Sequence, residues 1–119
     1  MATAAATRAD LLFRAFADPI RIRILRLLQP GELCVCDLVD VLKLPQPTIS
    51  RHLAYLRRSD LVSVREEASW NYYSLAPARS ALQAKLLDCL ESSAREIPEM
   101  AADARRANAV RKRGGCCPA

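Results

Sequence analysis

The sequence contains no hydrophobic run long enough to cross a membrane, and it does not open with a basic segment followed by an apolar stretch and a cleavage site. It also lacks a Gly-rich loop of the kind that holds phosphate in many enzymes. Repeats and low-complexity segments are absent as well. We therefore expect a cytoplasmic protein without membrane contact or enzymatic activity, and 119 residues suffice for one domain with a modest core.

The sequence has five cysteines, and in a reducing compartment these are not expected to form a structural disulfide framework. Cys34 and Cys36 lie two residues apart at the predicted start of a helix, where the exposed N–H groups favour the thiolate form that binds soft metals. Cys116 and Cys117 follow two glycines near the C-terminus, and these give them reach. Cys89 lies on the apolar side of its predicted helix, where a cysteine typically belongs to a core or an interface.

The periodicity of apolar residues predicts mainly helices with one β-hairpin. An amphipathic helix covers residues 8–17, and a second begins at Pro19 with Asp18 as its N-cap and ends before Pro30. A short helix follows, in which Cys34 replaces the usual Ser or Thr cap and Asp37 completes an imperfect capping box. The remaining predicted elements are a turn at residues 44–47, a helix to residue 58, strands at 61–64 and 70–75, and a helix from Pro77 through Leu90.

The helix after the turn has two distinct faces. At about 100° per residue, Ile49, Leu53 and Leu56 form a buried stripe. The opposite, exposed face is small, polar and basic and contains Pro47, Arg51, Ala54 and Arg58, flanked by Thr48, Ser50, Tyr55 and Arg57. Such a face can enter the major groove of DNA, although it can also be a solvated surface. The formal net charge of +5 leaves the same two alternatives open, a polyanionic partner or simple solubility.

A short helix pair followed by a hairpin is the order of elements of a winged helix-turn-helix. We expect residues 1–93 to form this DNA-binding and dimerisation domain, mainly α with a β-hairpin wing. Its first helix and the helix at 77–90 should form the dimer surface, because their apolar faces exceed what so small a core needs. Residues 94–119 should be a basic, flexible tail that ends in the vicinal cysteine pair, with a marginal helix at 99–113.

Four segments together resemble the ArsR/SmtB family of metal-responsive repressors: Asp18-Pro19-Ile20-Arg21, residues 32–38, Ser50-Arg51-His52-Leu53 and Trp70-Asn71-Tyr72-Tyr73. The segment Leu33-Cys34-Val35-Cys36-Asp37-Leu38 closely resembles the arsenical branch. The resemblance implies a homodimer that binds operator double-stranded DNA and is released when cysteine thiolates bind As(III) or Sb(III). It also implies that DNA is approached by Gln46, Thr48, Ser50, Arg51 and His52, and by Arg65 in the wing.

The sequence departs from this branch at the effector site and in the wing. Val39 occupies the position where members can have a third cysteine, so Cys116 and Cys117 are the candidate third ligands for an arsenic that prefers three sulfurs. Ala68 replaces the usual glycine of the wing tip, and the acidic residues beside it weaken the case for a phosphate contact. Between Pro77 and Leu90 there are no histidines of the kind that zinc sensors of the family use, which argues against zinc sensing there.

We hypothesise a mechanism from the spacing of the first two thiols. On a regular helix Cys34 and Cys36 would point about 200° apart, so a shared ion would require the first turn to open. The resulting strain would move the following helix through Pro45-Gln46-Pro47. The alternatives are a thiol redox switch, a regulator that responds to another soft metal such as cadmium or lead, and a winged-helix protein that works through protein contacts.

Overall fold

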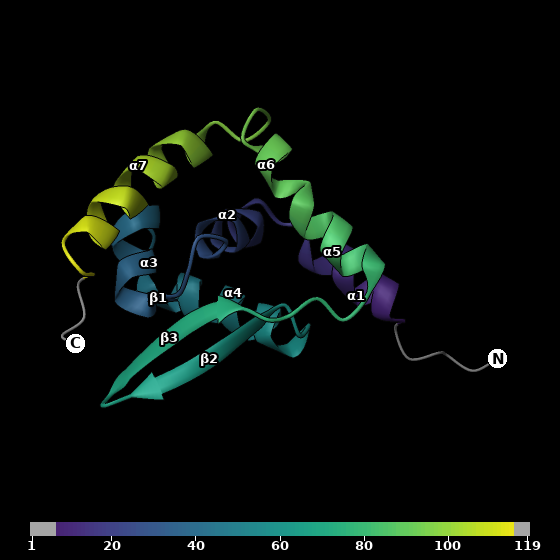
Figure 1. The fold of residues 1–119 in the computed structure, drawn as a ribbon, viewed down its shortest axis with the longest axis horizontal. Coiled ribbons are helices and arrows are strands. Elements are labelled where there is room, and N and C mark those ends of the chain that lie inside the picture. The colour runs from purple at the N-terminus through teal and green to yellow at the C-terminus, as the bar shows by residue number, and fades with distance from the viewer. Residues whose placement is uncertain (1–6, 116–119) are drawn as a thin grey trace.

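The computed structural model describes residues 7–115, which form seven helices and a three-stranded antiparallel sheet (Figure 1). The elements are α1 (Arg8–Ala15), α2 (Pro19–Leu28), β1 (Leu33–Cys34), α3 (Val35–Leu42), α4 (Gln46–Arg58), β2 (Val62–Glu67), β3 (Trp70–Leu75), α5 (Ala81–Asp88), α6 (Leu90–Ser93) and α7 (Glu99–Lys112). Helices α3 and α4 with the β2–β3 hairpin form the predicted winged helix-turn-helix. Within the described residues, none of the helices is long and apolar enough to span a membrane.

The N-terminal caps of the first helices follow the sequence closely. The Asp18 side chain accepts hydrogen bonds from the backbone N–H groups of Ile20 and Arg21 at 2.8 and 3.2 Å, and Pro19 opens α2. The apolar faces of α2, α3 and α4 meet in one core, in which Leu25 and Leu53 have no exposed surface. Burial of these faces is the main source of the stability that holds the DNA-binding elements together.

Several elements differ from the prediction: α1 ends at Ala15 instead of residue 17, and β2 runs to Glu67 instead of residue 64. The sequence did not reveal β1, which adds a third strand by pairing Leu33 and Cys34 with the central strand β3. The helix expected from Pro77 begins only at Ala81, because the Ala76 N–H still donates to Leu61 O, and Ser80 rather than Pro77 supplies the cap. This helix also ends at Asp88, and residues 90–93 form the separate short α6.

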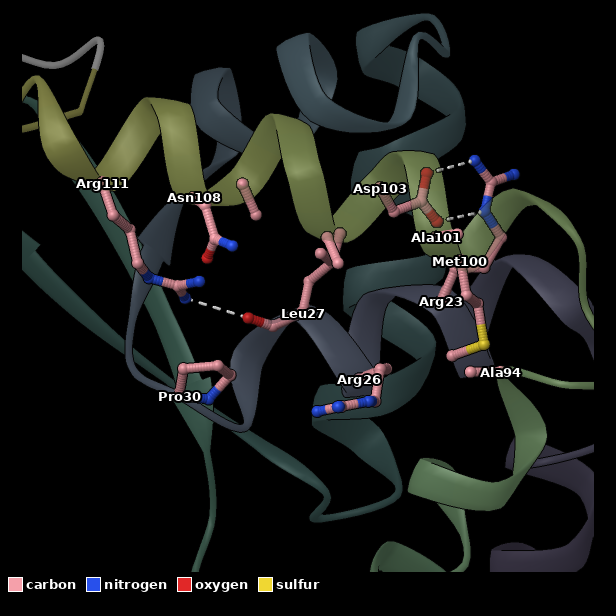
Figure 2. A pocket seen from close by; sticks show the side chains of 12 residues that line it. Arg23, Arg26, Leu27, Pro30, Ala94, Met100, Ala101, Asp103, Asn108 and Arg111 are labelled. Atoms are coloured by element: carbon pink, nitrogen blue, oxygen red, sulfur yellow. Dashed lines mark hydrogen bonds and ion pairs between the residues drawn. The ribbon is translucent and has the colours of Figure 1, made fainter.

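Helix α7 lies across α2 and α3 at one end of the molecule (Figure 1). Side chains of α2 and α7 line a cavity of about 290 Å³ (Figure 2). Arg111 of α7 donates to the carbonyl oxygens of Leu27 and Gly31, both at 2.9 Å, which fixes α7 to the end of α2 and the turn before β1. Burial lowers the pKa of Arg111. The predicted marginal helix is therefore present in a well-packed form.

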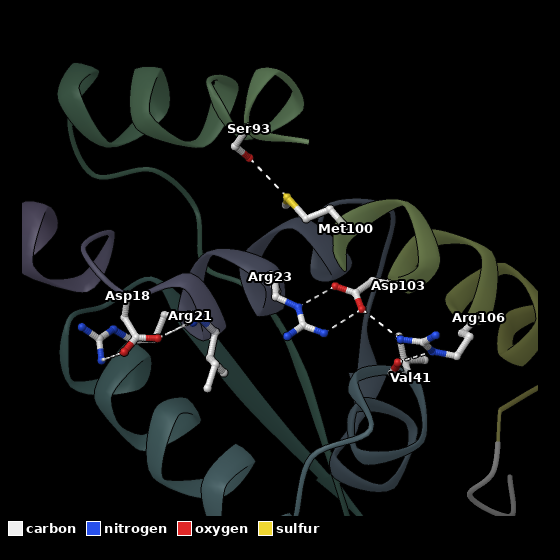
Figure 3. Close-up of polar contacts among 9 residues, drawn as sticks. Asp18, Arg21, Arg23, Val41, Ser93, Met100, Asp103 and Arg106 are labelled. Carbon is white, nitrogen blue, oxygen red and sulfur yellow. Dashed lines mark hydrogen bonds and ion pairs between the residues drawn. The ribbon is translucent and has the colours of Figure 1, made fainter. Parts of the chain in front are cut away.

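A buried carboxylate holds the other end of α7. Asp103, only 2% exposed, accepts hydrogen bonds from Arg23 Nε and Nη2 at 2.8 and 2.9 Å, and Arg106 donates both to Asp103 and to Val41 O of α3 (Figure 3). Residues 99–112 are thus packed on the domain instead of forming the flexible tail that we expected, because polar partners compensate for the weak apolar stripe of α7. A domain division at residue 93 stays a prediction.

The surface expected to form a dimer combines α1 with α5. Arg8 of α1 donates to the buried Gln83 of α5 and to Ser59 O, and these bonds hold the two helices together. Apolar side chains remain exposed on both helices: Phe13 of α1 is 54% exposed, and Leu82 and Leu86 of α5 are only partly buried. Dimerisation through this surface stays a prediction.

Candidate effector site and nucleic-acid interface

Cys34 is the N-cap of α3 and uses its thiol where a hydroxyl usually serves. Its backbone is extended, with φ −86° and ψ 168°. The Asp37 N–H donates to Cys34 Sγ at 3.4 Å, and the Cys34 N–H donates to Asp37 Oδ2 at 3.3 Å. The predicted capping box is confirmed, and it fixes one thiol and one carboxylate at the positive end of the helix dipole.

The sulfur atoms of Cys34 and Cys36 lie 2.9 Å apart, longer than the about 2.05 Å of a covalent S–S bond and close enough for one thiol to donate to the other. The expectation that these thiols diverge was wrong. It treated both residues as helical, whereas the extended Cys34 directs its side chain back over the first turn. The first turn therefore need not unwind before both sulfurs can contact one ion.

Asp37 adds an oxygen ligand to this pair. The ligand atoms of Cys34, Cys36 and Asp37 all lie within 4.8 Å of one another, and Cys34 and Asp37 are almost fully buried. Two sulfurs beside a carboxylate form a donor set suited to a soft cation. We refer to these three residues as the thiol site.

The residues that follow α7 lie beside the thiol site, although they are far from it in the sequence. Gly114 and Gly115 adopt left-handed conformations, with φ +84° and +86°, and the Gly115 N–H donates to Val110 O at 2.8 Å, as in a Schellman motif. A Cβ placed on Gly115 would lie 3.3 Å from Asp37 Oδ2. The predicted ligands Cys116 and Cys117 lie outside the described residues, but the described chain ends in contact with the thiol site.

A cavity of about 420 Å³ opens beside the two cysteines. Its walls come from three elements that are separate in the sequence: the start of α3, the first residue of α4 and the tip of the wing. The lining residues are Cys34, Val35, Cys36, Val39, Gln46, Ser69, Trp70 and Asn71. The sequence indicated the cysteines and Gln46 separately, but gave no sign that Trp70 lies near them, because the pairing of β1 with β3 brings the wing to the thiols.

The exposed face of α4 has the predicted composition. Ile49, Leu53 and Leu56 are buried, whereas the side chains on the opposite face reach the solvent. The exposed residues of α4 are Gln46, Pro47, Arg51, Ala54, Arg57 and Arg58, with Thr48, Ser50 and Tyr55 partly exposed. Arginine side chains on such a face can contact guanine edges and phosphates.

His52 differs from the other predicted DNA contacts because it is only 7% exposed. Its Nδ1 lies 3.4 Å from Arg21 Nη1, and burial lowers its pKa. The same arginine stacks on Tyr55 at 4.0 Å from the ring centroid and donates to Ala15 O. These contacts favour a packing role for His52, and its contact with DNA stays a prediction.

Arg65 in the wing is engaged by carboxylates. It forms ion pairs with Glu32 at 2.5 Å and Glu67 at 2.9 Å, and it stacks over Tyr72. Arg65 lowers the pKa of Glu32, and the pKa of Arg65 is raised mainly by its hydrogen bond to Glu32. At the wing tip, Ala68 has φ +58°, a conformation that glycine adopts without strain. A phosphate contact by Arg65 would have to compete with Glu32.

Cys89 is not in the core, the first of its two expected positions, and its place at an interface stays a prediction. It is exposed, and its thiol donates to Leu86 O at 3.0 Å. Cys89 and Arg95 also have a Cys-x5-Arg spacing, which in some enzymes surrounds an anion-binding loop. Here the residues between them form the short α6, so the spacing creates no such loop.

Comparisons with known proteins agree with this arrangement. Residues 18–64 match the family described as bacterial regulatory protein, arsR family. The chain is 45% identical over 82 residues to an uncharacterized HTH-type transcriptional regulator of Methanocaldococcus jannaschii, covering 68% of this chain and 92% of the relative. It is 49% identical over 78 residues to the arsenical resistance operon repressor of Escherichia coli K12, covering 65% and 67%. The fold matches HlyU from Vibrio cholerae with a TM-score of 0.64 and 36% identity, covering 71% of this chain and 89% of that one.

Proposed function

Because the chain belongs to the arsR family of bacterial regulatory proteins, which are DNA-binding transcription regulators and not enzymes, we propose that it is an arsenite- and antimonite-responsive repressor. In this proposal a homodimer binds operator DNA through α4 and the wing. Binding of As(III) or Sb(III) to thiolates of Cys34 and Cys36 then releases the DNA. The observation that carries the proposal is the 2.9 Å separation of the two sulfurs at the N-terminus of α3.

Support for a third sulfur comes from the end of α7. Trivalent arsenic prefers three sulfur ligands, and the described part of the thiol site offers two. Gly115 lies beside Asp37, and consecutive α-carbons are about 3.8 Å apart, so a chain that continues from Gly115 has the reach to bring a thiol to the site. We propose that Cys116 or Cys117 completes the arsenite site.

The connection between the thiol site and DNA is short. Helix α3 begins at the thiol site and ends at Leu42, and Lys43 in a left-handed conformation starts the turn into α4. Gln46, the first residue of α4, lines the same cavity as the two cysteines. A ligand that draws the tail onto the thiol site would therefore act on the start of the recognition helix and on the wing, without any need to unwind α3. This route replaces the strained first turn that we hypothesised.

Operator release is the direct test. A duplex bound by the protein would be selected from a random pool, and its affinity measured by fluorescence anisotropy with increasing arsenite under a phosphine reductant. Replacement of Cys34 and Cys36 by Ser should abolish release while DNA is still bound, because Ser retains the acceptor that caps α3. Cys89→Ser is the matched control, since that thiol is exposed and does not line the cavity.

The assignment of a third sulfur to Cys116 or Cys117 is tested by a separate variant. Replacing Cys116 and Cys117 by Ser together should raise the arsenite concentration needed for release. Normal release by the Cys34→Ser/Cys36→Ser variant would disprove the proposal. Normal release by the tail variant would instead remove only the third-ligand assignment.

The short sulfur separation also supports a second candidate, a thiol redox switch at the same cysteines. A switch of this kind would release DNA on treatment with a thiol oxidant and would bind no stoichiometric arsenite under reducing conditions. Metal stoichiometry therefore separates the two functions. The same titration with cadmium and lead tests a response to other soft metals.

A further inference from the structure

The two thiols of the site open onto a cavity that is larger than arsenite needs. Its volume is about 420 Å³, whereas a closed apolar cavity of about 150 Å³ can hold benzene. Its lining includes three large apolar side chains, Val35 and Val39 from α3 and Trp70 from the wing. Each of these side chains is only partly covered by the protein, so apolar surface remains for a ligand to bury.

The number of sulfurs at the start of α3, from the N-cap Cys34 and from Cys36, points to the chemistry of such a ligand. Trivalent arsenic forms three bonds, so arsenite bound by two thiols still needs a third ligand. A monosubstituted trivalent arsenical already has one bond to carbon and needs only two sulfurs. Cys34 and Cys36 satisfy this requirement by themselves, and the carbon substituent would extend from the arsenic into the cavity.

We propose that the Cys34–Cys36 pair also binds monosubstituted trivalent arsenicals, with an aromatic substituent packed against Trp70. This inference rests on the proposed arsenic response of the same site. The reaction converts R–As=O and two thiols into R–As(S–Cys)₂ and one water molecule; two As–S bonds replace the As=O bond, and nothing is oxidised or reduced. Two aromatic rings in contact add stabilisation beyond the area that they bury.

A substituent in this cavity would lie between two elements that contact DNA, and it would therefore affect DNA binding directly. The cavity is bounded by Gln46, at the start of α4, and by residues 69–71 of the wing. These two elements must keep a fixed relation to contact DNA together. A ring between them acts on both, so an aromatic arsenical needs no tail thiol to release DNA.

Phenylarsine oxide and methylarsine oxide are suitable probes, because both react with two thiols and they differ in the ring. Binding would be followed by intact-protein mass spectrometry and by the fluorescence of Trp70, the only tryptophan of the chain. In a Cys116→Ser/Cys117→Ser background, which removes the second dithiol of the chain, we expect one phenylarsenic adduct per chain, lost on further replacement of Cys34 and Cys36 by Ser, and a change in Trp70 emission larger for phenyl than for methyl. We also expect Trp70→Ala to reduce the preference for phenyl over methyl by roughly 2- to 10-fold, and Trp70→Phe to restore most of it.

The outcomes separate this inference from the proposed function. An unchanged phenyl-to-methyl preference in Trp70→Ala would overturn it, as would an adduct that survives loss of Cys34 and Cys36 in the background without Cys116 and Cys117. Replacement of Cys116 and Cys117 by Ser should raise the half-saturating concentration of arsenite far more than that of phenylarsine oxide. If arsenite fails to bind while phenylarsine oxide binds against Trp70, only the arsenite proposal fails.

Discussion

Gly115 lies beside the carboxylate of Asp37, with little space for a side chain between them: an added Cβ would lie 3.3 Å from Oδ2 and 3.5 Å from Oδ1. The backbone N–H of Asp37 donates to Cys34 Sγ. The last residue of the described chain is thus in contact with the residue that orients the first thiol. This contact links α7, which lies outside the matched family region, to the candidate effector site.

The first prediction uses this contact. Gly115→Ala should weaken arsenite binding, because its methyl group displaces either the tail or Asp37. Gly114→Ala is the matched control: Gly114 has almost the same φ, but its Cβ would meet nothing within 4 Å. Both variants should lose about 1 to 2 kcal/mol of stability through left-handed strain, and only Gly115→Ala should raise the half-saturating arsenite concentration. An equal rise in both would show that strain, not contact with Asp37, controls binding.

The second prediction concerns pH. Burial holds the pKa of His52 below its ordinary value of 6.5, so the unfolded chain takes up this proton first as the pH falls. The stability due to neutral His52 is complete above pH 6.5 and is lost as the pH falls through the lower folded pKa. Urea unfolding at about pH 7.5 and about pH 5.5 should therefore show a larger loss for the wild type than for His52→Gln. The hypothesis of a buried neutral histidine fails if the two proteins lose stability equally.

The third prediction concerns the wing. Glu32→Gln should tighten DNA binding and steepen its salt dependence, because it removes the carboxylate that engages Arg65 and leaves the guanidinium available for phosphate. One additional phosphate contact changes the slope of log K against log salt by about 0.9. In Arg65→Ala the same Glu32→Gln change should have a much smaller effect. Equal effects in both backgrounds would mean that Glu32 acts through general charge repulsion.

The recognition helix and its exposed face could be predicted from the sequence because periodicity and caps are local properties. The capping box at Cys34 and Asp37 was predictable for the same reason. The proximity of the two thiols was not, since it depends on the extended backbone of Cys34, which pairs with β3. The packing of α7 was also missed, because its central contact joins Asp103 to Arg23, 80 residues earlier in the chain.

That distant contact gives the last prediction. Asp103→Ala should cost about 3 to 5 kcal/mol of stability, because it leaves the Arg23 guanidinium, with its side chain only 11% exposed, without its carboxylate. Asp103 raises the pKa of Arg23, so this arginine stays charged and the penalty cannot be avoided by loss of its proton. Urea unfolding gives the free energy. Asp40→Ala is the matched control, because the ion pairs of Asp40 with Lys43 and Arg113 are exposed and should contribute at most about 1 kcal/mol.

The same pair of variants tests whether α7 holds the tail at the thiol site. If it does, Asp103→Ala should raise the half-saturating arsenite concentration, whereas the response to phenylarsine oxide, which needs only the thiols of Cys34 and Cys36, should change much less. The double variant Arg23→Met/Asp103→Leu should recover most of the stability, because it replaces the buried charges with apolar groups of similar volume. If arsenite binding recovers together with stability, then packing of α7, and not the charge of Asp103, is what the effector site requires.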